Sequence, residues 1–155
     1  MRTWVAIASR LGTISDQLVV ANVKTINLGL CKARWSHDKS LIRVRVVGVF
    51  LESHRNLLHQ AMAVDANECE VQIVDLREAT ICYEPRPSQT LEWFSSIAYV
   101  CRDEQLALVA DIASRSVMYG CVTRSFSEYE EALLWCRRQI ESDALLRQVV
   151  RVAPD

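Results

Sequence analysis

The chain has 155 residues, of which 50% are hydrophobic and 24% are charged, with only 4 glycines and 3 prolines. This composition fits one globular domain with a sizeable core and excludes a long disordered linker. Because 18 lysines and arginines stand against 19 aspartates and glutamates, the net charge of -1 excludes a general attraction to nucleic acid or to an acidic membrane, but not a local basic patch.

Six cysteines, at positions 31, 69, 82, 101, 121 and 136, are spread along the chain without a C-x-x-C pair. Several lie inside apolar runs, where cysteine behaves as a small hydrophobic residue, so we expect a reducing compartment and neither a disulfide framework nor a zinc site. His54 and His59 are five residues apart, which on a helix directs them about 140° away from each other. No carboxylate or cysteine completes a ligand set near them, and we expect no metal and no cofactor.

The N-terminus does not match a signal peptide. Its apolar run, residues 4–8, is interrupted by Ser9 and Arg10, whereas a signal sequence needs roughly 7–15 apolar residues. No stretch approaches the roughly 20 apolar residues of a membrane span. We therefore expect a cytoplasmic protein without a transmembrane segment.

The first half of the chain predicts an extension, a hairpin and a helix. Residues 1–26 are interpreted as an N-terminal extension, because its apolar part fits a strand or a helix equally well. Residues 28–35 and 41–50 alternate apolar and polar side chains around five polar residues, which predicts an antiparallel hairpin. A helix is expected next, capped by Glu52 or Ser53. Its apolar face is formed by Leu57, Leu58, Ala61 and Met62.

Residues 70–77 predict an inner strand, because they are apolar and rich in β-branched side chains. Asp75 and Arg77 are expected at its C-terminal end, where open sheets place binding groups. The structural alternative, which we favour, is that Asp75 accepts hydrogen bonds from the following loop while Arg77 reaches solvent.

The second half of the chain predicts alternating helices and strands. Two prolines interrupt residues 79–88, after which Ser88 fits an N-cap. The expected elements are a helix over residues 89–102, a strand over 106–111 that ends on Asp111, a short helix over 112–119, a strand over 121–126, and a helix that begins after the capping box of Ser127 and Glu130.

Residues 143–155 are interpreted as a C-terminal tail. The segment 144–152 is apolar with spaced arginines, and it fits a continued helix, an added strand or a docking arm. Self-association into a homodimer and packing on the same domain are equal alternatives.

Strands separated by helices predict parallel pairing, and the opening hairpin adds an antiparallel edge. The predicted fold class is therefore α/β: residues 27–142 form a small mixed sheet, with an antiparallel N-terminal hairpin and then parallel strands, flanked by helices.

The strand ends and helix starts resemble the STAS and SpoIIAA-like domains of bacteria. The resemblance covers about residues 28–142. It is carried by LIRVRVVG at 41–48, IVDLREAT at 73–80, LALVAD at 106–111, RSF at 124–126 and EEALLW at 130–135. It implies a SpoIIAA-like sheet and a role in protein–protein regulation or small-ligand binding without catalysis.

One departure from the family concerns its phosphorylation switch. Anti-sigma-factor antagonists of this family carry an Asp-Ser-Ser-Gly motif after the third strand, with a phosphorylated serine. An ungapped reading from Asp75 places that position on Tyr83 and Glu84, and only an insertion of a few residues brings in Ser88, with Arg86 two residues away. The predicted regulatory or binding surface consists of Asp75, Arg77, Tyr83, Glu84, Arg86, Ser88 and Asp111.

Three functions remain after the motifs are considered. The leading hypothesis is a non-catalytic regulatory module with a protein partner and no nucleic acid. The alternative is a binder of an apolar small molecule or lipid, in a pocket walled by Trp93, Phe94, Ile97 and Met118. The third is an enzyme built on Asp75, Arg77 and Asp111, for which no nucleophile elbow, phosphate loop or zinc motif is present.

Overall fold

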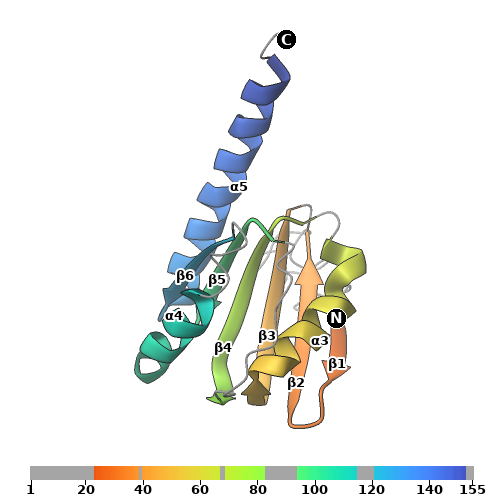
Figure 1. Ribbon diagram of the computed structural model, residues 1–155, viewed down its shortest axis with the longest axis vertical. Helices are drawn as coiled ribbons and strands as arrows, with labels where there is room; N and C mark the ends of the chain where they lie inside the picture. The colour runs from red at the N-terminus through yellow and green to blue at the C-terminus, as the bar shows by residue number, and fades with distance from the viewer. Residues whose placement is uncertain (1–22, 39, 67–68, 83–93, 115–120, 153–155) are drawn as a thin grey trace, which may run out of the picture.

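The computed structural model describes residues 23–38, 40–66, 69–82, 94–114 and 121–152. They form one six-stranded sheet in which the strands follow the order of the chain (Figure 1). The strands are β1 (Lys24–Asn27), β2 (Cys31–His37), β3 (Leu41–Leu51), β4 (Val71–Cys82), β5 (Ser96–Val100) and β6 (Val122–Phe126). The helices are α3 (Glu52–Ala66), the 3-10 turn η1 (Asp103–Gln105), α4 (Leu106–Ser114) and α5 (Tyr129–Val152).

Strand directions confirm the predicted fold class. β1, β2 and β3 pair antiparallel, whereas β4, β5 and β6 each pair parallel to the strand before them. The first hairpin is therefore continued by parallel strands in an α/β sheet. The change from antiparallel to parallel pairing occurs at β3, which pairs antiparallel with β2 and parallel with β4.

The core has two parts, one on each face of the sheet. On the first face α3 and α4 bury Leu58, Met62, Val109 and Ala113 against the sheet. On the second face, Ala132 and Cys136 of α5 pack on the inner part of β4 and β5. We call these the closed face and the open face, because α5 packs mainly on β4, β5 and β6 and leaves β1 to β3 largely without a helix (Figure 1).

Strand β3 passes very close to the loop that precedes β2. Gly48 has a φ of 103°, and a Cβ atom at this position would lie 2.6 Å from the carbonyl oxygen of Leu30. A side chain is excluded both by the backbone conformation and by this contact. Gly48 thus lets β3 stay paired with the start of β2, opposite Cys31.

Two predicted elements are of the wrong type. The run 106–111 was expected as a strand, but it opens α4, in which Val109 and Ala113 share the buried side four residues apart. A six-residue apolar run does not by itself distinguish a strand from a buried helix. Conversely, β5 lies within residues 89–102, where a helix was predicted. Its five residues are all buried, and a strand covered on both faces lacks the alternation of apolar and polar side chains that would identify it.

The predicted boundaries fall inside regular structure. β1 crosses the predicted boundary between the extension 1–26 and the domain that follows, and all four of its residues pair with β2. The predicted boundary at 142 lies inside α5, which runs on to residue 152, so the described part of the tail continues the helix.

The C-terminal half of α5 extends beyond the sheet (Figure 1). Its large apolar side chains Leu145, Leu146, Val149 and Val150 are 62 to 74% exposed. Asp143 still accepts a hydrogen bond from the Ser95 hydroxyl at 2.8 Å, and Arg147 forms an ion pair with Glu70. Within the described ranges, no helix has the length and apolar character needed to cross a bilayer.

Candidate functional site

A groove of about 390 Å³ lies on the open face, between the first residue of α5 and the strands that α5 leaves uncovered. It is lined by Val23, Arg34, Trp35, Ser36, Arg43, Val44, Arg45, Asp75, Arg77 and Tyr129. Four of these residues are arginines and one is an aspartate. The groove is therefore the local basic patch that a net charge of -1 leaves room for.

The strand register explains how these side chains come together. Arg34 lies directly opposite Arg45, and Ser36 lies opposite Arg43. Across the next pair of strands, Arg45 is the partner of Asp75. Because side chains two residues apart share one face, both rows point to the open face. Like charges directly opposite each other weaken a sheet, so the Arg34 and Arg45 pair opposes folding.

Asp75 and Arg77 form the best-defined ion pair of the groove. The Arg77 Nε and Nη2 atoms donate to the two carboxylate oxygens of Asp75 at 2.9 and 2.8 Å, and the Arg77 backbone N–H adds a third bond at 3.1 Å. Burial acts to raise the pKa of Asp75, but these bonds and the nearby positive charge lower it below its ordinary value. Asp75 is thus held ionised, which suits a fixed charge better than a proton donor or acceptor.

Tyr129, the first residue of α5, closes one side of the groove. The Arg77 guanidinium lies 5.8 Å from the centre of its ring, within the range of a cation–π contact. Burial raises the pKa of Tyr129, while the nearby Arg43 acts in the opposite direction. The phenol is consequently protonated at neutral pH and is available as a hydrogen-bond donor.

The other three arginines are less completely paired than Arg77. Arg45 donates to Glu78 at 2.5 Å, where both side chains are more than half exposed. Arg43 approaches Asp38 at 3.4 Å, and its buried Nε has no hydrogen-bond partner. Arg34 has no ion pair within the described part of the chain. The groove therefore presents unsatisfied guanidinium donors beside two rim carboxylates.

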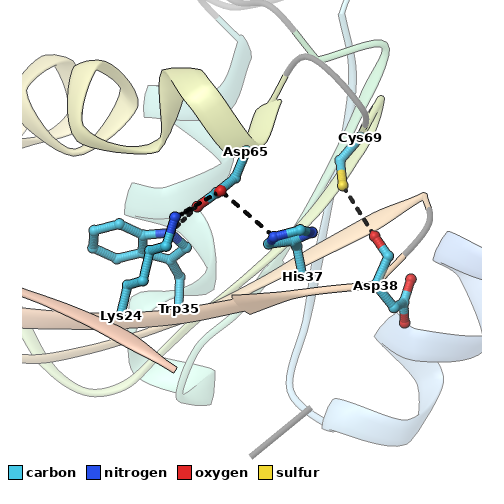
Figure 2. Close-up of polar contacts among 6 residues, drawn as sticks. All are labelled: Lys24, Trp35, His37, Asp38, Asp65 and Cys69. Carbon is cyan, nitrogen blue, oxygen red and sulfur yellow. Dashed lines mark hydrogen bonds and ion pairs between the residues drawn. The ribbon is translucent and has the colours of Figure 1, made fainter. Parts of the chain in front are cut away.

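A second polar cluster, on the closed face, fixes the edge of the sheet to α3. Figure 2 shows Lys24, Trp35 and His37 converging on Asp65 near the end of α3. The distances to the Asp65 carboxylate are 2.8 Å from Lys24, 2.9 Å from the Trp35 indole nitrogen and 3.5 Å from His37. Burial acts to raise the pKa of Asp65, but the bonds from Lys24 and Trp35 lower it. The contacts span β1, β2 and α3, which is the pattern of a structural pin.

A cysteine and a histidine also meet on the closed face. The Sγ atom of Cys31 lies 3.5 Å from the Nδ1 atom of His54, which also accepts a hydrogen bond from the Leu51 N–H at 3.1 Å. Burial raises the pKa of the Cys31 thiol, so it stays protonated at neutral pH. A neutral, buried thiol is a poor nucleophile, and the pair is better explained as packing between β2 and α3.

These contacts identify residues that sequence reasoning missed. The sequence placed Arg34, Arg43 and Arg45 only within alternating strands, and it gave Asp65 no role. A carboxylate near the C-terminus of a helix opposes the helix dipole, which was the available signal for Asp65. Cys31 and His54 are separated by 23 residues, so their contact had no sequence signal.

Of the three predicted surface residues that the structure describes, it brings together Asp75 and Arg77. Neither lies at the end of its strand, because β4 continues to Cys82. Asp111 lies on α4, which packs on the closed face, and so it does not share a sheet edge with them. Tyr83, Glu84, Arg86 and Ser88 lie outside the described residues.

Of the predicted apolar pocket, Phe94 and Ile97 are described, and both are core residues that are at most 3% exposed. Trp93 and Met118 lie outside the described residues. An apolar cavity does lie on the closed face between Phe50, Tyr99 and Ile112, but its volume of about 20 Å³ has room for about one water molecule. In the described ranges, no group of three or more histidine, cysteine or acidic side chains is placed to hold a metal ion.

Comparison with known proteins yields a likeness of fold. No protein-family model matches the chain, and no curated protein matches it significantly. A solved structure from Shewanella loihica PV-4, described as an uncharacterized protein from the DUF3478 family with a SpoIIAA-like fold, is similar at a TM-score of 0.46 and 13% identity. The match covers 73% of this chain and 98% of that one.

Proposed function

We propose that this chain is a non-catalytic regulatory module that binds a protein partner on the open face of its sheet. The observation that carries the proposal is the unequal covering of the two faces. α3 and α4 cover one face, whereas α5 leaves the groove over β2 and β3 accessible. The groove is an exposed surface whose charged side chains are held by neighbouring strands, and such a surface is suited to binding another protein.

The chemistry of the groove supports binding better than catalysis. Asp75 is neutralised by Arg77 and has a lowered pKa, so it is a weak general base. The described thiols of Cys101, Cys121 and Cys136 have pKa values raised by burial to about 11, about 11 and about 12, and they are not activated nucleophiles. A protein partner needs shape and charge from this surface, and both are present.

Site-specific photo-crosslinking tests this proposal. Val47 is 41% exposed and lies on the open face beside the groove, opposite Lys32, whereas Val64 on α3 is 78% exposed and belongs to the other face. A benzoylphenylalanine placed at Val47 in cells of the native host should capture one protein. The same group at Val64 should not capture it.

The captured protein, once purified, should bind the unmodified chain, and an excess of the unmodified chain should compete with its crosslinking at Val47. Equal capture from Val47 and Val64, or no capture from Val47, would overturn the proposal. The comparison is well matched because both positions are exposed valines in regular structure.

A further inference from the structure

The groove contains hydrogen-bond donors in excess of acceptors. Arg34 has no ion-pair partner in the described part of the chain, and the buried Nε of Arg43 donates to no acceptor. Ser36, opposite Arg43, adds a hydroxyl, and Tyr129 adds a protonated phenol. Buried donors without acceptors cost stability, and an oxyanion can accept from several of them at once.

The two arginines that face each other across β2 and β3 also favour an anion in the groove. Arg34 and Arg45 are direct cross-strand partners, a placement that raises the free energy of the folded chain. Only Arg45 has a carboxylate partner, Glu78. An anion seated between Arg34 and Arg43 would relieve the repulsion, because it would place negative charge beside the arginine that lacks a partner.

The surroundings favour a single anionic group over a long polyanion. Asp38 and Glu78 stand at the rim and would repel a continuous phosphate backbone. The net charge of -1 also gives the chain no long-range attraction to nucleic acid. A carboxylate or phosphate carried on a protein side chain reaches the donors without crossing the rim charges.

The geometry points to an oxyanion subsite in which Arg34 and Arg43 hold a carboxylate or phosphate group of the partner, with Ser36 as a further donor. This inference rests on the proposed function, since it names the chemistry that the partner presents. Asp75 and Arg77 form one wall of the groove, where their mutual bonds leave the Arg77 guanidinium beside the Tyr129 ring and its charge compensated.

Arginine side-chain NMR on the purified full-length chain tests the subsite without any partner. Inorganic phosphate titrated into labelled protein should shift the Nε–Hε signals of Arg34 and Arg43 in a saturable way. Arg43→Gln and Arg34→Gln should each weaken phosphate binding about tenfold or more, because each removes a charge-assisted hydrogen bond. Arg102→Gln, which removes an equal charge from an exposed arginine paired with Glu104, should leave the affinity unchanged.

Two peptides then identify the source of the anion. A glutamate-rich peptide and a phosphoserine peptide of the same length are titrated separately, and tighter binding of either one assigns the group. Linear, non-saturable shifts with phosphate and both peptides would overturn the subsite, as would equal losses from Arg102→Gln and Arg43→Gln. Tighter binding of a single-stranded oligonucleotide than of both peptides would also overturn it.

The outcome is separable from that of the proposed function. A partner captured at Val47 together with no saturable anion binding would leave the interaction module standing and remove only the oxyanion subsite. Saturable phosphate binding without capture at Val47 would remove the protein partner and leave an anion-binding groove.

Discussion

The two faces of the sheet differ in how they treat polar side chains. On the closed face, the carboxylate of Asp65 is 7% exposed and accepts bonds from two or more donors, so its charge is compensated within the fold. On the open face, four arginines line a groove beside a single aspartate. Asp65 is thus used to hold two strands to a helix, whereas Arg34 and Arg43 on the open face keep hydrogen-bond donors available to a group outside the chain.

The largest effect is expected from Ile97, which is fully buried on the closed face although the sequence suggested a pocket wall. Ile97→Ala should lower the free energy of unfolding by about 2 to 5 kcal/mol, because it removes core contacts and leaves a cavity. Urea unfolding measures the loss. Val122→Ala, at a position 53% exposed, serves as control, with an expected change within about 0.5 kcal/mol. A small loss at Ile97 with impaired ligand binding would instead assign it to a pocket.

A smaller effect is expected from the pin at Asp65. Asp65→Asn should lower stability at pH 7 by about 1 to 3 kcal/mol, because the bonds from Lys24 and Trp35 lose their charged acceptor. The folded pKa of Asp65 is lowered, so its contribution is complete above the ordinary value of about 3.9 and is lost as the pH falls through the folded pKa. The difference between wild type and variant should therefore shrink in acid.

Thermal unfolding of both proteins between pH 7 and pH 2.5 measures this difference. Asp103→Asn, at an exposed aspartate, is the control, with an expected change in stability at pH 7 within about 0.5 kcal/mol. A constant difference across the range would mean that Asp65 contributes through packing and not through its charge.

The open face should respond in its binding more than in its stability. Asp75→Asn removes the single carboxylate of the groove lining, so phosphate should bind about threefold more tightly. The titration is repeated with Asp103→Asn, which should match wild type. Weaker phosphate binding by Asp75→Asn would show that the Asp75 and Arg77 bonds orient the site more than their charge opposes it.

The smallest effect on folding should come from Arg34. Arg34→Gln is expected to raise the free energy of unfolding by a few tenths of a kcal/mol, about 0.2 to 0.5, because it relieves repulsion from Arg45. The same variant should bind phosphate more weakly. Stability gained together with affinity lost is the signature of a residue kept for binding, whereas a loss of stability would make Arg34 part of the fold.

How much of this could be predicted depends on the range of the interactions. The alternation at Arg43 and Arg45 and the apolar run at β4 are local, and they placed both strands and the mixed sheet. The groove depends on contacts between distant parts of the sequence. It forms because the strand register places Arg34 opposite Arg45 and because α5 packs on β4 to β6 and leaves β3 largely uncovered. Residues 96–100 were predicted as a helix because complete burial removes the alternation that identifies a strand. Residues 106–111 were predicted as a strand because so short an apolar run shows no clear helical period, although only Val109 of it is buried.

The end of α5 that extends beyond the sheet has little tertiary packing to stabilise it, because its large apolar side chains are exposed. Arg147, which pairs with Glu70 just before β4, is the last residue of α5 with an ion pair or hydrogen bond to the rest of the domain among the described residues. Among the same residues, the turn and a half after it forms no such contact. So short a helical segment is marginal in water. Hydrogen exchange should therefore quicken stepwise from Asp143 toward residue 152, so that the length of this helix varies with temperature while the sheet below it stays intact.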